Sequence, residues 1–320
     1  MNKTLSKILK TAIPLGLGVF LIWYTYSKFS SQQLEELRLH FKDANYGIVL
    51  LSVLLSILSH ISRAYRWGFM LEPLGHKPKL ANSFMAISVA YLMNIFIPKS
   101  GEVSRAIILD KYEDVAFEKG FGTILSERFI DLIFLLGFTA LALYLKFDVL
   151  YNYIGERIPL SLLYAASIGG VVLVLALLLF FKYSNSSLSE KIKKFLLGLK
   201  EGLLSIFKMK KKTPFIFHSF VIWGLYILSF YTATQALNET SQIAFSTIII
   251  AFVVGSFTFA FTNSGFGTYP VAIAGILILF AVPFTVGTAF GWIVWISNIV
   301  SIVLFGVLSL LLLPHFNKNT

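Results

Sequence analysis

The chain has 320 residues, of which 57% are apolar and only 13% charged, and it contains no cysteine. Soluble domains carry about a quarter charged residues, so this composition is typical of a membrane protein with several spans, and the missing cysteines exclude disulfides, thiolate metal sites and a cysteine nucleophile. Lys and Arg outnumber Asp and Glu by 27 to 16. These charges are too few for a contiguous nucleic-acid surface, and we expect them to report membrane orientation instead.

Several apolar windows approach the roughly 20 residues that a membrane-spanning helix needs. They are Ile13–Ser27, Tyr46–Ser62, Phe121–Leu145, Leu160–Phe181, Phe215–Ala236, Ile243–Thr262 and Phe284–Leu313. The first window follows three lysines, and no small-residue cleavage pattern comes after it, so we interpret it as an uncleaved anchor.

Two shorter apolar stretches, Ala81–Pro98 and Tyr269–Pro283, are interrupted by proline or asparagine. We predict that they form broken, short or re-entrant helices rather than ordinary spans. One lies in each half of the chain, which is consistent with an internal repeat. In transporters such paired interruptions are the best sequence indication of a substrate site.

The loop Lys182–Thr213 carries nine lysines against two glutamates and is therefore predicted to be cytoplasmic. Counting spans from this loop makes Ala81–Pro98 re-entrant, or pairs it with a second half-helix near Val103–Leu109, and requires Tyr269–Pro283 to cross once. The predicted fold is an all-α polytopic integral membrane protein, a single transmembrane domain over residues 1–320. It has about eight transmembrane helices and one re-entrant or broken helix, and both termini are cytoplasmic.

Within the lysine-rich loop, apolar residues recur at helical spacing over residues 188–207, with lysines between them. This pattern predicts an amphipathic helix that lies in the headgroup plane and is attracted to an anionic membrane surface. An ordinary basic linker helix explains the same pattern.

The first polar cluster follows the first interrupted stretch and contains Asn94, Lys99, Gly101, Glu102 and Arg105. Pro98 ends one helix and Ser100 can cap the next, after which Lys99, Glu102 and Arg105 recur every three residues, approximately on one face. A helix start at membrane depth beside two cations suits a phosphate headgroup. The alternative is a solvated turn in which Glu102 pairs with Arg105.

The second cluster, Glu127, Arg128 and Asp131, lies inside the window Phe121–Leu145. Charges at that depth are costly unless they are paired or face a polar cavity, which makes them candidates for function. A purely structural ion-pair cluster between helices is the alternative. We interpret Arg63, Arg66 and Trp67, at the end of the second window, as snorkelling arginines with an interfacial tryptophan.

The third cluster, Asn263, Gly265, Gly267 and Tyr269, lies at the interruption in the second half. Its two glycines allow close approach of the backbone, and exposed amides there could hold an anionic oxygen. Breaking a helix for packing alone is the alternative.

Catalytic motifs are missing from the sequence. The five histidines are scattered without metal-ligand spacing, and no Walker, G-x-S-x-G or H-E-x-x-H motif occurs. We therefore predict no catalytic residue, no metal site and no cofactor.

The motifs occur in the order Arg63…Arg66-Trp67, Asn94-x-x-x-Pro98, Gly101-Glu102-x-x-Arg105, Glu127-Arg128-x-x-Asp131 and Gly265-Phe-Gly267. In this order they resemble the flippase-like, lysylphosphatidylglycerol synthase transmembrane-region family over nearly the whole chain. The resemblance implies a plasma-membrane protein of about eight spans, related to the lipid-translocating part of the bacterial multiple peptide resistance factor.

The resemblance has two limits. In many relatives the late loop reads P-G-G-x-G-x-x-E, whereas here Pro270 stands at the acidic position, so no late acidic role carries over. The fused relatives also have a cytosolic aminoacyl-transfer domain. The longest polar stretch here, Lys182–Thr213, is too short to fold as such a domain, so a synthase activity is not expected.

The leading hypothesis is a flippase or scramblase that moves a phospholipid or polyprenyl-phosphate lipid between leaflets. Its phosphate would meet Lys99, Arg105, Arg128 and the backbone amides near Gly101 and Gly265. Glu102, Glu127 and Asp131 would hold these cations or titrate during the cycle. A membrane-embedded enzyme or enzyme subunit with Glu127 or Asp131 as general base, and a non-transporting scaffold, are the alternatives.

Overall fold

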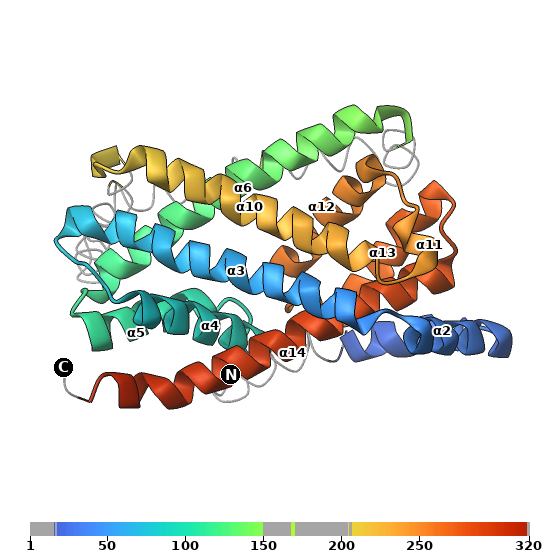
Figure 1. Ribbon diagram of the computed structural model, residues 1–320, viewed down its shortest axis with the longest axis horizontal. Coiled ribbons are helices and arrows are strands. Elements are labelled where there is room, and N and C mark those ends of the chain that lie inside the picture. The colour runs from blue at the N-terminus through green and yellow to red at the C-terminus, as the bar shows by residue number, and fades with distance from the viewer. Residues whose placement is uncertain (1–15, 17, 150–167, 170–203, 205–206, 319–320) are drawn as a thin grey trace.

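The computed structural model describes residues 16, 18–149, 168–169, 204 and 207–318. The predicted span Leu160–Phe181 and the amphipathic helix predicted at 188–207 fall almost entirely outside these residues. The elements are α2 (Ser31–Asp43), α3 (Tyr46–Leu71), η1 (Glu72–Leu74), α4 (Leu80–Phe96), α5 (Gly101–Glu113), α6 (Phe117–Leu145), α10 (Lys212–Thr234), α11 (Asn238–Ser241), α12 (Phe245–Phe261), α13 (Thr268–Leu277), η2 (Ile278–Phe280) and α14 (Phe284–Phe316) (Figure 1). Every regular element in the described part is a helix, which confirms the predicted all-α membrane class.

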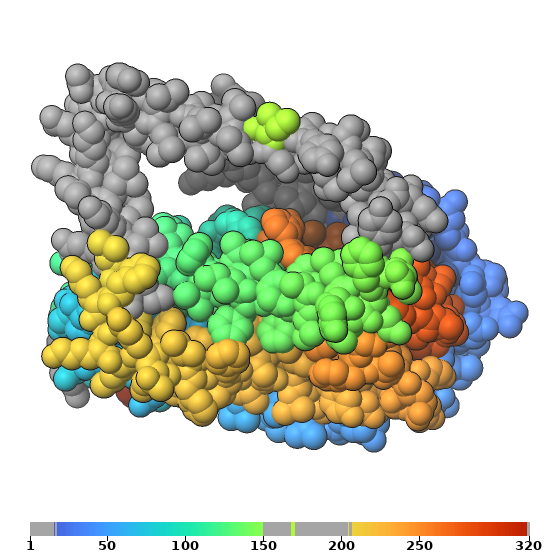
Figure 2. All heavy atoms as spheres, turned by 90° about the horizontal axis from the view of Figure 1, so that it is seen from above, coloured from blue at the N-terminus to red at the C-terminus, as the bar shows by residue number. Residues whose placement is uncertain are grey.

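Among the described residues, four helices, α3, α6, α10 and α14, are long and apolar enough to cross a membrane. Helices α3 and α10 pack together in antiparallel fashion. Lys211, before α10, pairs with Glu72, after α3, at 3.2 Å. At the other end the Asn45 amide donates to the Ala236 carbonyl. Figure 2 shows α6 beside α10, where Phe134 and Phe138 stack on Trp223 with ring centroids 5.9 and 5.6 Å apart.

Helices α4 and α5 form a helical hairpin, in which the first residues of α4 lie beside the last residues of α5. The Lys79 amide and the Asn82 side chain both donate to Glu113 Oε1, so the start of α4 is adjacent to the end of α5. The turn places Lys99 at a φ of 61°. The hairpin agrees with the re-entrant prediction, and α5 contains the half-helix expected near Val103–Leu109. Ser100 does not cap α5, because its hydroxyl donates back to the Met93 and Ile97 carbonyls.

Helices α12 and α13 form a second hairpin, which enters the bundle from the opposite end. His40 of α2 lies 3.6 Å from Glu239, just before α12, and Phe29, just before α2, contacts Phe284, just after α13. This hairpin is an alternative to the expectation that Tyr269–Pro283 crosses the membrane once, which stays a prediction. The ten residues of α13 rise about 15 Å, half of a hydrocarbon core, and the positive φ angles of Gly265 and Gly267 allow the chain to reverse in the preceding turn.

The two hairpins meet tip to tip inside the bundle. The Lys99 ammonium donates to the Ala260 carbonyl, and the Asn263 side-chain amide donates to the Ile95 carbonyl at 3.0 Å. Each half of the described chain thus has the order long helix, hairpin, long helix. The second group, α10 to α14, runs in the opposite direction to the first group, α3 to α6 (Figure 1). This arrangement agrees with the predicted internal repeat and is the inverted type found in many transporters.

The apolar core is divided unequally between the two ends of the helix bundle. The larger part surrounds α12, α13 and the first half of α14 and includes Trp223, Phe252 and Phe290. A smaller part around Trp67 and Ile124 packs beneath the first hairpin. Between the two lie the charged side chains described next.

Candidate functional site

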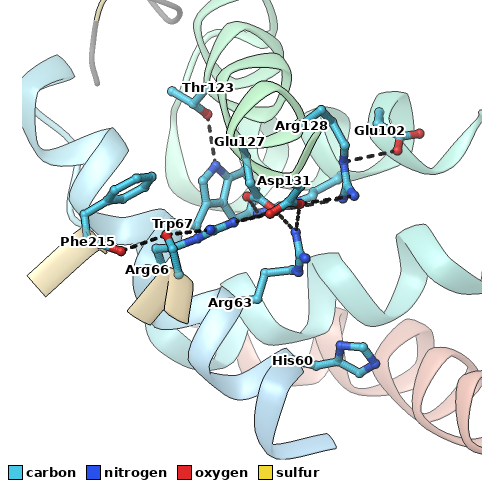
Figure 3. Close-up of polar contacts among 12 residues, drawn as sticks. His60, Arg63, Arg66, Trp67, Glu102, Thr123, Glu127, Arg128, Asp131 and Phe215 are labelled. Carbon is cyan, nitrogen blue, oxygen red and sulfur yellow. Dashed lines mark hydrogen bonds and ion pairs between the residues drawn. The ribbon is translucent and has the colours of Figure 1, made fainter. Parts of the chain in front are cut away.

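Seven charged side chains from α3, α5 and α6 gather beside the first hairpin, and we call them the charged cluster. They are Arg63, Arg66, Glu102, Arg105, Glu127, Arg128 and Asp131. Figure 3 shows the guanidinium groups surrounding the two carboxylates of α6. Arg63 lies eight residues before the end of α3 and Glu127 ten residues after the start of α6, which places both about 12–15 Å from their helix ends.

Helical spacing explains how the cluster assembles. Arg63 and Arg66 are three residues apart on α3, and Glu127 and Asp131 are four apart on α6, so each pair shares a face. Arg105 projects from the returning arm of the hairpin and completes the group. Charged residues inside spanning helices almost always face the interior and pair with one another, as they do here.

Glu127 is fully buried and is the most heavily contacted carboxylate. It accepts hydrogen bonds from Arg63 and from both terminal nitrogens of Arg105, at 3.2 and 2.8 Å, while Arg66 Nη2 lies 3.6 Å away. Asp131 accepts from Arg63 at 2.6 Å and from Arg66 at 3.2 Å. These two carboxylates therefore hold three buried guanidinium groups in fixed positions.

Neighbouring side chains fix the arginines further. The Arg105 guanidinium stacks on the ring of Trp67 at 3.6 Å, and the indole of Trp67 donates to Thr123 at 2.9 Å. Arg66 donates to the Ser219 hydroxyl of α10 at 2.9 Å. The cluster consequently ties α3, α5, α6 and α10 together.

Positive charge exceeds negative charge in the cluster. Four arginines oppose three carboxylates, which leaves a formal excess of +1. Within the described part of the chain, the Nε atoms of all four arginines lack a hydrogen-bond partner. An anion beside the cluster would compensate the excess charge.

Arg128 is the most open cation of the cluster. Its side chain is 38% exposed, whereas those of Arg63, Arg66 and Arg105 are at most 3% exposed. Its closest carboxylate oxygens, on Glu102 and Asp131, are 3.6 Å away, and among the described residues its guanidinium makes no hydrogen bond. The Nη1 and Nη2 donors of Arg128 are therefore available to a ligand, whereas its Nε is buried.

Arg128 lines a small, partly open pocket between α4, α5 and α6, which we call the anion pocket. Its other polar lining residues are Tyr91, Asn94, Glu102 and Arg105. A planar guanidinium with open donors beside excess positive charge matches the geometry of a phosphate or carboxylate.

The structure brings together part of the predicted site. Asn94, Glu102, Arg105 and Arg128 line the anion pocket, and Glu127 and Asp131 lie behind it. Contrary to the solvated-turn alternative, Glu102 pairs with Arg128 and Arg105 pairs with Glu127.

Gly101 and Lys99 have other roles. The Gly101 amide donates to Asn94 Oδ1 at 2.8 Å, so it is not open to an anion. A Cβ at Gly101 would lie 2.6 Å from Asn94 Nδ2, which explains the glycine by close packing. Lys99 contacts the second hairpin rather than the pocket.

The late residues Asn263, Gly265, Gly267 and Tyr269 do not line the anion pocket. The Gly265 amide donates to the Thr262 hydroxyl at 3.1 Å, and a Cβ at Gly267 would overlap the backbone of Gly18. Tyr269 is buried against Phe259. The late loop thus shapes and joins the hairpins, as the packing alternative proposed.

Sequence reasoning missed Arg63, Arg66 and Trp67. We expected them at the membrane surface, but all three are buried, with at most 2% of their surface exposed. The signal that could have found the two arginines is the charge balance of the second cluster. Its two carboxylates, Glu127 and Asp131, outnumber its single cation, Arg128, so a further cation was needed at that depth. Tyr91, which lines the pocket, carried no distinguishing signal.

Together the paired hairpins and the buried charges define a polytopic helical membrane protein with an internal charged site in its described part. Its family follows from sequence comparison: a model of the lysylphosphatidylglycerol synthase TM region family matches residues 11–315, and the chain belongs to this family.

Curated relatives support the same class. The UPF0104 membrane protein MJ1078 of Methanocaldococcus jannaschii is 27% identical over 224 residues, which cover 68% of this chain and 92% of the relative. The UPF0104 membrane protein MJ1595 of the same organism is 26% identical over 42% of this chain and 40% of its own. The UPF0104 membrane protein PH1989 of Pyrococcus horikoshii is 24% identical over 59% of this chain and 64% of the relative. No solved structure was found to match the chain.

Proposed function

We propose that the protein is a lipid flippase or scramblase that binds the phosphate of a membrane lipid or lipid-linked intermediate at Arg128. The observation that carries this proposal is the open guanidinium of Arg128, facing a pocket at membrane depth inside a cluster with excess positive charge. Keeping charge at such depth is costly, and ligand or substrate pathways are a common reason for it.

The two hairpins support transport over static binding. In transporters built from inverted repeats, substrate sites lie near the midplane where discontinuous helices meet, and one repeat moves against the other. Here the tips touch through only two hydrogen bonds among the described residues, from Lys99 and Asn263. A headgroup could cross between the hairpins while its acyl chains remain in lipid.

The charged cluster supplies distinct roles. Arg128 binds the phosphate, and Asn94 and Arg105 line the same pocket. Glu102, 3.6 Å from Arg128 Nε, orients the guanidinium from one side. Glu127 and Asp131 keep the buried arginines in place.

We also propose a plasma-membrane location with both termini cytoplasmic. If α3, α6, α10 and α14 cross and the hairpins do not, adding the windows Ile13–Ser27 and Leu160–Phe181 gives six crossings. This even number leaves both ends on the side of the lysine-rich loop. The charged cluster then lies in the cytoplasmic half of the bundle.

The rival enzyme hypothesis assigns Glu127 or Asp131 as general base. Both carboxylates accept hydrogen bonds from two arginines each, which stabilises their charged form and occupies their oxygens. A general base must reach the proton that it removes, so this geometry favours a positioning role. Formation of a chemically altered lipid in the assay below would instead favour the enzyme.

The test is lipid exchange in proteoliposomes that contain a fluorescent anionic phospholipid, with and without an imposed proton gradient. We expect the wild-type protein to accelerate exchange. Arg128→Gln should slow it about 10- to 100-fold, since a charge-assisted hydrogen bond contributes about 1.5–3 kcal/mol. Arg38→Gln is the matched control, because Arg38 is 78% exposed on α2 and pairs only with Glu35 among the described residues.

Two results would contradict the proposal. If wild-type protein accelerates exchange of no phosphate lipid, transport is not its function. If Arg128→Gln exchanges lipid as fast as Arg38→Gln, the phosphate does not bind at Arg128.

A further inference from the structure

The tips of the two hairpins cap each other's interrupted helices. Lys99, in the turn after α4, donates to the carbonyl of Ala260, the second-last residue of α12. Asn263, in the turn after α12, donates at 3.0 Å to the carbonyl of Ile95, the second-last residue of α4. Carbonyls in the last turn of a helix have no partner within that helix. Each hairpin therefore satisfies a carbonyl of the other, and we call these two hydrogen bonds the tip latch.

The tip latch carries costs that favour its opening. Lys99 and Ser264, one in each turn, have positive φ angles of 61° and 52°, a conformation that is unfavourable for residues with a Cβ. Asn263 Oδ1 is buried and lacks a hydrogen-bond partner among the described residues. The Lys99 side chain is exposed, so its ammonium can leave the carbonyl for another acceptor.

The tip latch adjoins the anion pocket. Asn94 and Glu102 line this pocket, and they lie on the two arms of the first hairpin just before and just after the turn that contains Lys99. Asn94 Oδ1 also accepts a hydrogen bond from the Gly101 amide at 2.8 Å, which joins the turn to the pocket wall. A phosphate that approaches Arg128 between the hairpins would therefore pass Lys99.

A phosphate can compete with the bond that closes the tip latch. Hydrogen bonds between an ammonium and an anionic oxygen are shorter and stronger than those in which the acceptor is neutral, and lysine binds phosphate as a point charge. The carbonyl of Ala260 is a neutral acceptor, so an anionic phosphate could displace it from Lys99. A headgroup without a phosphate has no such advantage.

We propose that the tip latch is a gate that the substrate itself opens. The phosphate of a lipid takes the Lys99 ammonium from the Ala260 carbonyl, the tips separate, and the phosphate then passes to Arg128. This inference rests on the proposed function and adds the regulation of the same site. Lys99 selects lipids with a phosphate at the entrance, whereas Arg128 binds the phosphate inside.

The test measures opening of the tips by maleimide labelling of Ser264→Cys in purified full-length protein in detergent. Ser264 is half-buried in the second turn, and the chain has no other cysteine. The probes are a short-chain phosphatidic acid, the diacylglycerol with the same chains, and inorganic phosphate. We expect phosphatidic acid to raise the labelling rate at least about threefold, as a ligand that binds the open tips a few times more tightly would do. The other two probes should leave the rate unchanged.

Variants in the same Ser264→Cys background then locate the effect. Lys99→Met should label fast without lipid and should not respond to phosphatidic acid, because the latch has lost one of its two bonds. Lys42→Met is the matched control, since Lys42 is an exposed lysine on α2, and it should respond like the parent protein. Arg128→Gln should still respond, because the phosphate meets Lys99 before it reaches the anion pocket.

Four results would overturn the gate. They are a parent protein that does not respond to phosphatidic acid, a Lys99→Met protein that responds as the parent does, an Arg128→Gln protein that does not respond, and opening by inorganic phosphate alone. In each case lipid exchange in proteoliposomes would leave the proposed function standing. Conversely, tips that open with phosphatidic acid in a protein that exchanges no lipid would keep the gate and contradict transport.

Discussion

Replacing Glu127 by glutamine tests whether the charged cluster holds the bundle together. The substitution keeps the side-chain size but removes a fully buried negative charge that contacts Arg63 and both terminal nitrogens of Arg105. The formal charge of the cluster would rise from +1 to +2, and the charge lost is one at a fully buried position.

The structure sets the expected magnitude. Removing one partner of a buried ion pair destabilises proteins by about 3–5 kcal/mol. An independent estimate from Coulomb's law gives about 4 kcal/mol for a single pair 4 Å apart at an effective dielectric constant of 20. We therefore expect Glu127→Gln to lower the free energy of unfolding by about 3–5 kcal/mol, which is a change of about two to four orders of magnitude in the unfolding equilibrium.

The assay is unfolding by sodium dodecyl sulfate in mixed micelles, followed by far-UV circular dichroism. Glu35→Gln is the control, because its 3.1 Å pair with Arg38 is exposed on α2 and should contribute less than about 1 kcal/mol. Adding Arg105→Met to Glu127→Gln should cost less than the sum of the two single changes, since the residues are in contact. A Glu127→Gln protein as stable as Glu35→Gln would refute the reasoning.

Three further predictions concern packing and the hairpins. Gly101→Ala should destabilise the protein by about 1–3 kcal/mol in thermal unfolding, because the added Cβ would clash with Asn94. The control is Gly137→Ala, where a Cβ meets nothing within 4 Å and should change stability by less than about 1 kcal/mol. Equal effects of the two substitutions would refute the close packing at Gly101. Ser219→Ala removes the hydrogen bond to Arg66 and should cost about 1.5–3 kcal/mol in the detergent titration, and an unchanged midpoint would contradict it. Asn263→Ala should cost about 0.5–1.5 kcal/mol and increase maleimide labelling of a single cysteine introduced in the hairpin turn of this cysteine-free chain; unchanged labelling would show that the tips do not depend on this bond.

The sequence predicted those features that local patterns determine. The long apolar windows identify α3, α6, α10 and α14, because apolar length is what membrane insertion requires. The interruption at Asn94 and Pro98 identifies the first hairpin, and the depth of Glu127 and Asp131 in their window identifies the centre of the site. Each of these signals lies within one continuous segment of chain, at most about the length of one helix.

Features that depend on packing between distant segments could not be predicted. Arg63 and Arg66 near the end of a span have the pattern of snorkelling residues, and only the position of α6 beside α3 shows that they point inward. The role of the late loop also depends on a distant contact, because Asn263 bonds to Ile95 of the first hairpin rather than to a ligand. The packing of α13 beside α12 is also a tertiary feature, because an apolar helix of only ten residues can cross partway or return.

The most direct test of the central claim is an experimental structure of the protein in nanodiscs that contain a phosphate lipid. We expect a lipid phosphate in the anion pocket, with its oxygens about 2.7–2.9 Å from the guanidinium nitrogens of Arg128, and loss of that lipid in Arg128→Gln. An ordered lipid phosphate bound elsewhere, with the anion pocket filled by water or side chains, would contradict it.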